Sequence, residues 1–464
     1  MKKYVKTGAL AFLLGSVLVL AGCTRSQINY QIAEAIGTDG KYANNEPVET
    51  PKMAEERMLL EESESEEASL MEVLSEAERL AQGYNYEEAI SVLDTIPLPR
   101  AKDERVLEAR ERYEKGDKNL VSWVEGDIPH LCFPTLIYDT MMAFDGDDRA
   151  ADYNTTMVTC KEFSSILESL YANGFVLIDI HSIAQMVTDA RGTSSMEELT
   201  LKLPEGKRPI ILSQDNLNYS NVRDGDGIAT KLVLDENGKV KAQYTDSEGH
   251  AATGDYDFIP ILDTFIDEHP DFSFRGAKGI VSVSGSEGIF GYPIPGGGGD
   301  LSQGADASGT RTDSTGSSEA RTGGAGSSDG QNETVSAIAD ALRAEGWEIA
   351  CAGWSHSYMN DMSMETFAGE IDDWISKAGS IVGQSDILFY PYGAEVEYPG
   401  EKLDYLVDHG FCYLCGLWGD TDFREMGDRY MRMTRRFIDG YTLINAPVYF
   451  TSFFDAASLV DADR

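Results

Sequence analysis

From residue 127 onward the sequence alternates short apolar runs with amphipathic stretches. The strand-like runs are Ile128–Phe133, Phe175–Ile180, Arg208–Ser213, Gly279–Val283, Trp347–Cys351, Ile387–Tyr390, Phe411–Gly416 and Tyr441–Ala446. The stretches with helical spacing include Glu162–Ala172, Ile259–His269, Thr334–Glu345 and Met364–Val382. Strands that alternate with helices favour a parallel sheet, and seven or eight such units favour a barrel. We therefore predict an α/β fold, a (β/α) barrel of seven or eight strands, over residues 127–455.

One segment interrupts this alternation. Residues 295–332 consist mainly of Gly, Ser, Thr and Asp, with very few apolar side chains. Such a composition is typical of a disordered insertion within a domain. The segment contains no GxxxxGK[ST] sequence, so it is not a phosphate-binding loop of that class.

The first 23 residues have the parts of an export signal. Lys2, Lys3 and Lys6 precede an apolar run, Ala9–Leu20, which is shorter than the roughly 20 residues of a membrane-spanning helix. The run ends in Leu20-Ala21-Gly22-Cys23, which looks like a bacterial lipobox. Residues 1–23 are then a lipoprotein signal peptide, and lipidation of Cys23 (palmitate) anchors the chain on the extracellular face of the cell membrane. The alternative is an ordinary signal peptide with a chance cysteine.

Two further segments precede the barrel. Residues 24–65 are polar and acidic, and we predict a disordered tether there. In residues 66–117 apolar side chains recur every three to four positions, which predicts a helical hairpin followed by a third helix. This segment is similar to a single tetratricopeptide unit. It either packs on the main domain or recruits a protein partner.

The charge and the cysteine content bear on which partners and metal sites the chain can have. The net charge is −41, from 38 basic and 79 acidic residues, which argues against nucleic acid as a partner. Of six cysteines, Cys412 and Cys415 form a CxxC inside an apolar run, and there is no second CxxC to complete a zinc cluster. A buried strand with two thiols is one interpretation of this pair, and a redox or metal role is the other.

Polar residues follow three of the predicted strands, where a (β/α) barrel carries its chemistry. These segments are Ser213-Gln214-Asp215-Asn216, Ala352-Gly353-Trp354-Ser355-His356 and Tyr390-Pro391-Tyr392-Gly393. Their order and spacing resemble the polysaccharide deacetylases, also called the NodB-homology domain or carbohydrate esterase family four. The resemblance covers roughly residues 127–455. Within the family, the sequence most resembles a branch of lipoproteins whose first motif reads Ser-Gln-Asp-Asp.

The resemblance implies a distorted barrel and a reaction. Members of the family hydrolyse the N-acetyl groups of sugars, as their name states, with one Asp as general base. The next Asp and two His, four residues apart, bind a zinc-like ion. Three protein ligands leave one position open for a water molecule, whose pKa falls to about 7 on the ion.

Only part of that set is present in this chain. By resemblance, Asp215 takes the general-base position, Tyr392 lies in the oxyanion motif and His356 keeps the second metal-binding His. Asn216 stands in place of the metal-binding Asp, and Ala352 in place of the first His. An amide is a weak ligand and a methyl group is none. We therefore expect either no cofactor or a weakly bound divalent metal, and catalysis that is weakened or lost.

Two alternatives concern His356. The segment His356-Ser357-Tyr358-Met359-Asn360 has the form H-S-x-x-N, a shifted imitation of the metal motif whose last residue is again Asn. Otherwise His356 is a hydrogen-bonded structural residue.

Aromatic residues suggest sugar binding at the same strand ends. Trp354, Tyr390 and Trp418, with Tyr358 and Tyr392, lie at or just after strand ends and are predicted to contact substrate; packing is the alternative for each. Three functional hypotheses follow: a weakened deacetylase of cell-surface N-acetylated glycans, a non-catalytic binder of cell-wall polysaccharide, and a protein-interaction lipoprotein that works through residues 66–117.

Overall fold

A closed ring of seven parallel strands forms the centre of the computed structural model. Residues 50–124, 126–219, 225–296, 328–419 and 421–464 are described, with the side chains of residues 328 and 329 excepted. The chain consists of two compact units, Met1–Glu72 and Val73–Arg464, and the ring lies in the second unit. Its strands are β2 (His130–Phe133), β9 (Arg208–Gln214), β13 (Ile280–Val283), β14 (Glu348–Cys351), β15 (Ile387–Phe389), β16 (Tyr413–Leu417) and β18 (Met431–Phe437).

The strands pair in the order β2, β9, β13, β14, β15, β16 and β18, and β18 pairs with β2. Every neighbouring pair in this ring is parallel. Register examples are Ser213 opposite Ile280 and Leu131 opposite Arg436. The predicted α/β barrel is therefore confirmed, with seven strands.

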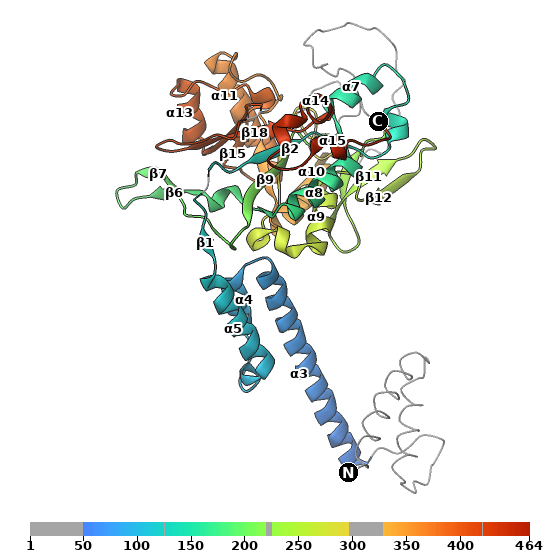
Figure 1. Cartoon of the computed structure of the whole chain (residues 1–464), viewed down its shortest axis with the longest axis vertical. Coiled ribbons are helices and arrows are strands. Elements are labelled where there is room, and N and C mark those ends of the chain that lie inside the picture. The colour runs from blue at the N-terminus through green and yellow to red at the C-terminus, as the bar shows by residue number, and fades with distance from the viewer. Residues whose placement is uncertain (1–49, 125, 220–224, 297–327, 420) are drawn as a thin grey trace. The chain divides into compact units, whose positions relative to one another are not determined.

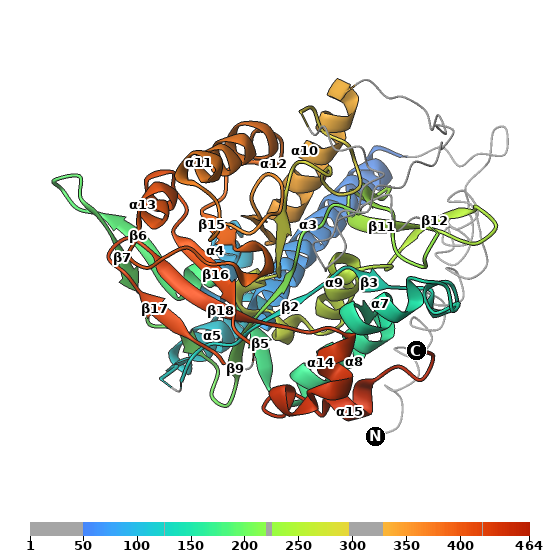
Figure 2. The same cartoon turned by 90° about the horizontal axis from the view of Figure 1, so that it is seen from above.

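Helices cover the outside of the ring, as the view from above shows (Figure 2). They include α8 (Cys160–Ala172), α9 (Phe258–Glu268), α10 (Ser328–Ala344), α11 (Met364–Asp373), α12 (Gly379–Val382), α13 (Glu401–Asp408) and α14 (Gly440–Asn445). The start of α8 is fixed by a capping box between Thr159 and Glu162. Its buried face, which includes Phe163, Ile166 and Leu170, joins the core between helices and strands.

Alternation along each strand separates two cores. One cluster of buried side chains joins the strands to the covering helices, and it includes Ile210, Ile349 and Leu388. The adjacent residues along the same strands belong to a second cluster, which also includes Met431 and Met433; they are Ile211, Ala350, Ile387 and Phe389. Because successive side chains of a strand point to opposite faces, the second cluster is the barrel interior.

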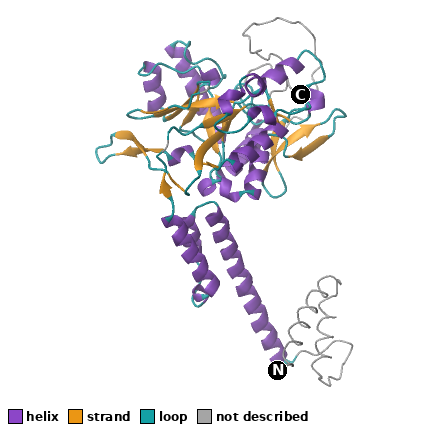
Figure 3. Cartoon of the chain, viewed as in Figure 1, coloured by secondary structure: helices purple, strands orange, loops and turns teal. Residues whose placement is uncertain are grey.

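Smaller elements surround the ring (Figures 1 and 3). The strand β5 (Phe175–Leu177) pairs with β9 outside the ring and leads into the 3₁₀ turn η2 (Ile180–Ser182), and β17 (Arg424–Met426) pairs antiparallel with β18. A three-stranded sheet contains β10 (Lys231–Leu234), β11 (Val240–Thr245) and β12 (Ala251–Gly254). The other short pairs are β1 (Val121–Ser122) with β8 (Lys202–Leu203), β3 (Leu136–Ile137) with β4 (Val158–Thr159), and β6 (Ala184–Thr188) with β7 (Ser194–Glu198). The remaining short helices are α6 (Thr140–Ala143), α7 (Ala150–Thr156) and α15 (Ala456–Leu459).

The helices before the barrel are α3 (Pro51–Gln82), α4 (Tyr86–Leu93) and α5 (Glu104–Lys118). Within the second unit, Glu78 on α3 accepts hydrogen bonds from Arg112 (2.9 Å) and Tyr113 (2.8 Å) on α5. The prediction of a disordered tether through residue 65 is wrong from Pro51 onward, because these residues are helical.

Two predicted strands need correction. Residues 441–446 were expected to be a strand, but residues 441–445 belong to α14, whose start is fixed by a capping box between Asp439 and Thr442. Phe175–Ile180 yields β5, which lies outside the ring. The strand missing from the prediction is β18, whose sequence MRMTRRF carries three arginines.

Several predictions fall outside the described residues. They concern the signal peptide, the lipid site Cys23, residues 24–49 of the tether and residues 297–327 of the insertion. The prediction of disorder is wrong for residues 328–332, because they belong to the helix α10. In the part of the chain that is described, no helix is both long and apolar enough to cross a membrane.

Candidate functional site

The predicted site residues follow the carboxyl ends of three ring strands. Asp215 and Asn216 come directly after β9, the segment from Ala352 to His356 follows β14, and Tyr392 lies just after β15. In a closed ring of parallel strands these ends share one rim, which is where barrel enzymes bind their substrates. The sequence prediction of a common location is therefore supported by the topology.

A buried arginine holds Asp215. Arg435, on β18, is completely buried, and its Nη1 donates a hydrogen bond to Asp215 Oδ1. Its guanidinium also lies over the ring of Phe389, 3.9 Å from the centroid. Arg435 Nε and Nη2 have no hydrogen-bond partner among the described residues. Asp215 is thus the only side chain in the described ranges to which this guanidinium donates, and the pair spans from one ring strand to another.

Asn216 is engaged locally. Its φ is +46°, in the left-handed region that Asn tolerates better than most residues. Its Oδ1 accepts a hydrogen bond from Ser284 Oγ at 2.7 Å, and its backbone N–H donates to Ser282 Oγ at 2.9 Å. The amide oxygen therefore already has a donor from the segment that follows β13.

His356 and Ala352 differ in what they offer. Ala352 is 1% exposed and presents only a methyl group. The ring of His356 lies 4.9 Å from that of Tyr392, and its φ is +51°. Burial lowers the pKa of His356 to about 4; Asp215 opposes this shift and Arg435 adds to it. The imidazole is therefore neutral at pH 7.

These residues do not fit a zinc-like ion. Of the three family positions, only His356 keeps a strong ligand, because Asn216 is a neutral amide bonded to Ser284 and Ala352 has no donor atom. The only nearby carboxylate of the motif, Asp215, is paired with Arg435. The shifted H-S-x-x-N alternative gains nothing either, because its last residue, Asn360, is an exposed amide. These residues therefore do not supply the three strong ligands that a hydrolytic ion needs.

Two exposed aromatic groups lie after ring strands. Tyr392 is 53% exposed and stacks on Tyr358, with centroids 4.5 Å apart and an interplanar angle of 20°. Trp418, after β16, is 41% exposed, stacks on Phe423 and donates from Nε1 to Glu395 at 2.6 Å. These rings have the exposure that contact with a sugar face requires.

Two of the predicted substrate contacts are wrong. Tyr390 is completely buried, and its hydroxyl is hydrogen-bonded to that of Tyr398 at 2.7 Å. Trp354 is 8% exposed, packs against Gly285 and has the Lys377 ammonium 4.6 Å from its ring centroid. For both residues the packing alternative is correct.

Sequence reasoning missed Arg435. A signal was present, because Met431, Met433 and Arg435 alternate and the two methionines belong to the barrel interior. By the two-residue period of a strand, Arg435 continues their inward face. A buried cation at the end of an inward apolar series requires an anion close to it, and Asp215 supplies that charge.

Comparison with known proteins gives one weak structural likeness. No family model matches the sequence. No curated protein matches it either. A solved structure described as Streptococcus pyogenes deacetylase PplD in complex with acetate is similar over 68% of this chain and 94% of that chain, with 10% identity and a TM-score of 0.34.

Proposed function

We propose that the barrel binds N-acetylated cell-surface glycans at the carboxyl-end rim, and that it has lost most or all deacetylase activity. The observation that carries this proposal is the state of the two substituted positions. The amide oxygen of Asn216 accepts a hydrogen bond from Ser284, and the side chain of Ala352 is a buried methyl group. A hydrolytic ion needs about three protein ligands, and these positions leave His356 as the single strong one.

The remaining groups suit recognition of a sugar. The stacked pair Tyr358–Tyr392 offers an exposed aromatic face for the apolar side of a pyranose ring. Asp215 can accept a hydrogen bond from a sugar hydroxyl or from an acetamido N–H. Its hydrogen bond with Arg435 holds the carboxylate in position.

A weakened deacetylase is the second candidate. One observation favours it: Asp215, in the general-base position of the resembled family, carries a full ion pair with Arg435. An ionised carboxylate is the form that a general base requires. Chelator-sensitive release of acetate from chitin-type oligomers by the purified chain would decide for this candidate.

We also propose that the protein is anchored on the outside of the cell. A lipid on Cys23 would hold the barrel on the outer face of the cell membrane, next to the cell-wall polysaccharide. Labelling of wild-type cells with a palmitate analogue, compared with a Cys23→Ser variant, tests it. We expect label and membrane association in the wild type only, and equal labelling of both chains would contradict the anchor.

Binding is tested with Tyr392→Ala and a matched control. The control is Leu107, on α5 before the barrel, which is 53% exposed, as Tyr392 is. We measure affinity for N-acetylglucosamine oligomers by calorimetry. Loss of an aromatic contact worth about 1 kcal/mol weakens binding roughly five- to ten-fold. Leu107→Ala should bind as the wild type does, and equal affinities for all three chains would refute the location.

Rebuilding the ligand set tests the loss of catalysis. The double variant Asn216→Asp, Ala352→His restores a carboxylate and an imidazole at the substituted positions. We expect it to bind more metal than the wild type and to release acetate from the same oligomers. If neither changes, the alignment of these residues with the family's metal-binding positions is wrong.

A further inference from the structure

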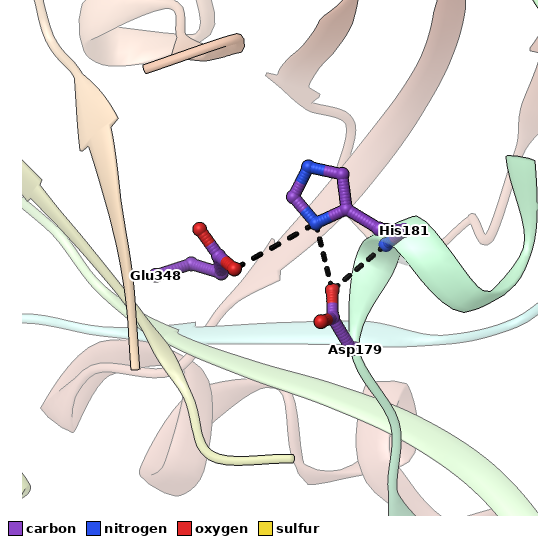
Figure 4. A group of neighbouring side chains, drawn as sticks. All are labelled: Asp179, His181 and Glu348. Atoms are coloured by element: carbon purple, nitrogen blue, oxygen red, sulfur yellow. Dashed lines mark hydrogen bonds and ion pairs between the residues drawn. The ribbon is translucent and has the colours of Figure 1, made fainter. Parts of the chain in front are cut away.

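Three potential metal ligands meet at a place remote from the rim described above. They are Asp179, His181 and Glu348, and Figure 4 shows their side chains pointing toward one another. His181 Nδ1 lies 2.9 Å from Asp179 Oδ1 and 3.7 Å from Glu348 Oε1. One ligand atom from each residue lies within 4.8 Å of the others.

This group belongs to the amino ends of the ring strands. Glu348 is the first residue of β14, four positions before Ala352, and by alternation its side chain is on the inward face with that of Ala350. Asp179 caps the start of η2, in the segment after β5, and His181 lies within η2; Asp179 Oδ1 accepts a hydrogen bond from the backbone N–H of His181 at 2.8 Å. Asp215, His356 and Tyr392 instead follow carboxyl ends, so the two groups of residues are separate.

A fourth carboxylate orients the imidazole. Asp386, immediately before β15, lies 3.1 Å and 3.3 Å from His181 Nε2 through its two oxygens. The ring of Tyr413 packs edge-on against His181 at 4.5 Å, and its hydroxyl donates to Ala184 O at 2.7 Å. These contacts direct Nδ1 toward Asp179 and Glu348. A carboxylate on the far ring nitrogen is the usual companion of a metal-bound histidine.

The charges around His181 do not balance. A protonated imidazole has only two N–H groups. Those of His181 would donate to Asp179 and Asp386, so neither would remain for Glu348. Within the described ranges Glu348 accepts no hydrogen bond, and its one ion pair is the 3.7 Å contact with His181. The nearby Arg343 donates instead to the carbonyls of Val382 and Gln384. Among the described residues, the three carboxylates thus have only the His181 ring as an ion-pair partner, and Arg343 acts on Glu348 from a greater distance; a divalent cation would neutralise the remaining negative charge.

We propose that Asp179, His181 Nδ1 and Glu348 bind a divalent cation of the zinc class, with Asp386 as the partner of the liganding histidine. Mixed nitrogen and carboxylate ligands suit zinc, whose bonds of about 2 Å place neighbouring ligand atoms about 3.3 Å apart. The observed 2.9 Å and 3.7 Å bracket that separation. The three side chains are 31–42% exposed, which admits a water molecule as fourth ligand.

The expected role of this ion is structural. It would connect the segment after β5 to the start of β14, two parts of the chain that are not neighbours in the ring. Groups at the amino-end face of a barrel generally serve stability, whereas chemistry is carried out at the other face. The proposal goes beyond glycan binding and does not depend on it.

The test is zinc binding by the full chain, purified without a histidine tag and stripped with a chelator. Bound metal is measured by mass spectrometry and affinity by competition with a fluorescent chelator. We expect one equivalent in the wild type. Glu348→Gln should weaken binding at least ten-fold, and Asp386→Asn about 10- to 100-fold, because each retains side-chain volume but removes a charge.

Two controls locate the ion. His250 also has two carboxylates near Nδ1, Asp246 at 3.4 Å and Glu248 at 3.7 Å, but its side chain is 73% exposed. His250→Ala and His356→Ala should both retain the wild-type affinity and stoichiometry. The proposal is overturned if the wild type binds no zinc saturably, if Glu348→Gln binds as the wild type does, or if His356→Ala removes the ion.

Discussion

Removal of Asp215 should destabilise the barrel more than the loss of one surface-accessible carboxylate would suggest. Its partner Arg435 is completely buried, and Asp215 itself has a side chain that is 18% exposed. In Asp215→Ala the guanidinium keeps its charge and loses its only described acceptor, since Nε and Nη2 already lack one. Breaking a buried pair in this way costs about 3–5 kcal/mol. That is a large share of the roughly 5–15 kcal/mol that stabilises a typical domain.

Urea unfolding followed by tryptophan fluorescence measures this cost. The double variant Asp215→Ala, Arg435→Met removes the stranded charge and should recover most of the lost stability. A matched control is Asp408→Ala, because Asp408 and Arg429 form an exposed pair at 2.8 Å. That change should cost less than about 1 kcal/mol. If Asp215→Ala is as stable as the wild type, or if the double variant is no better than the single one, Arg435 does not depend on Asp215 for its charge balance.

Two further predictions concern packing and protonation near the rim. His356 should titrate near pH 4 by NMR, because burial lowers its pKa from the ordinary value of about 6.5. The native state then favours the neutral ring, so stability relative to His356→Asn should fall as the pH drops from about 6.5 toward 4, by at most about 3 kcal/mol; a ring that titrates near 6.5 would contradict this. Gly285→Ala places a methyl group into the buried ring of Trp354 and should cost about 1–3 kcal/mol in thermal unfolding. Gly369→Ala, whose new methyl contacts nothing within 4 Å, should be neutral or stabilising, and equal effects would refute the packing argument.

Much of the barrel could be predicted because the period of its strands and helices is plain in the sequence. Ring strands such as β13 and β15 are almost wholly apolar, because both of their faces are covered. The exception is β18, which was not predicted as a strand and in which three of seven residues are arginines. Its charged residues find partners only in three dimensions: Arg435 pairs with Asp215, and Arg436 with Asp422. A pattern based on hydrophobicity cannot detect that compensation.

The site was predictable in part for a similar reason. The order of motifs at strand ends located Asp215, His356 and Tyr392, because topology fixes where strand ends lie. Exposure was not predictable, since Tyr390 and Tyr392 are two residues apart and one is buried while the other is 53% exposed. The group at Asp179, His181 and Glu348 escaped notice because its members are separated by up to 169 positions in the sequence and form no motif.

Closure of the ring between β18 and β2 bears on how the protein is synthesised. Strand β18 contributes both the hydrogen bonds that close the ring and the guanidinium that neutralises Asp215. During translation, about 220 further residues are added after Asp215 before its ion-pair partner Arg435 is synthesised. A nascent chain that terminates before residue 435 would therefore have an open edge next to β2 and an unpaired acid at the candidate site. The exposed backbone groups of that edge could pair with another chain, so a truncated product should be prone to aggregation.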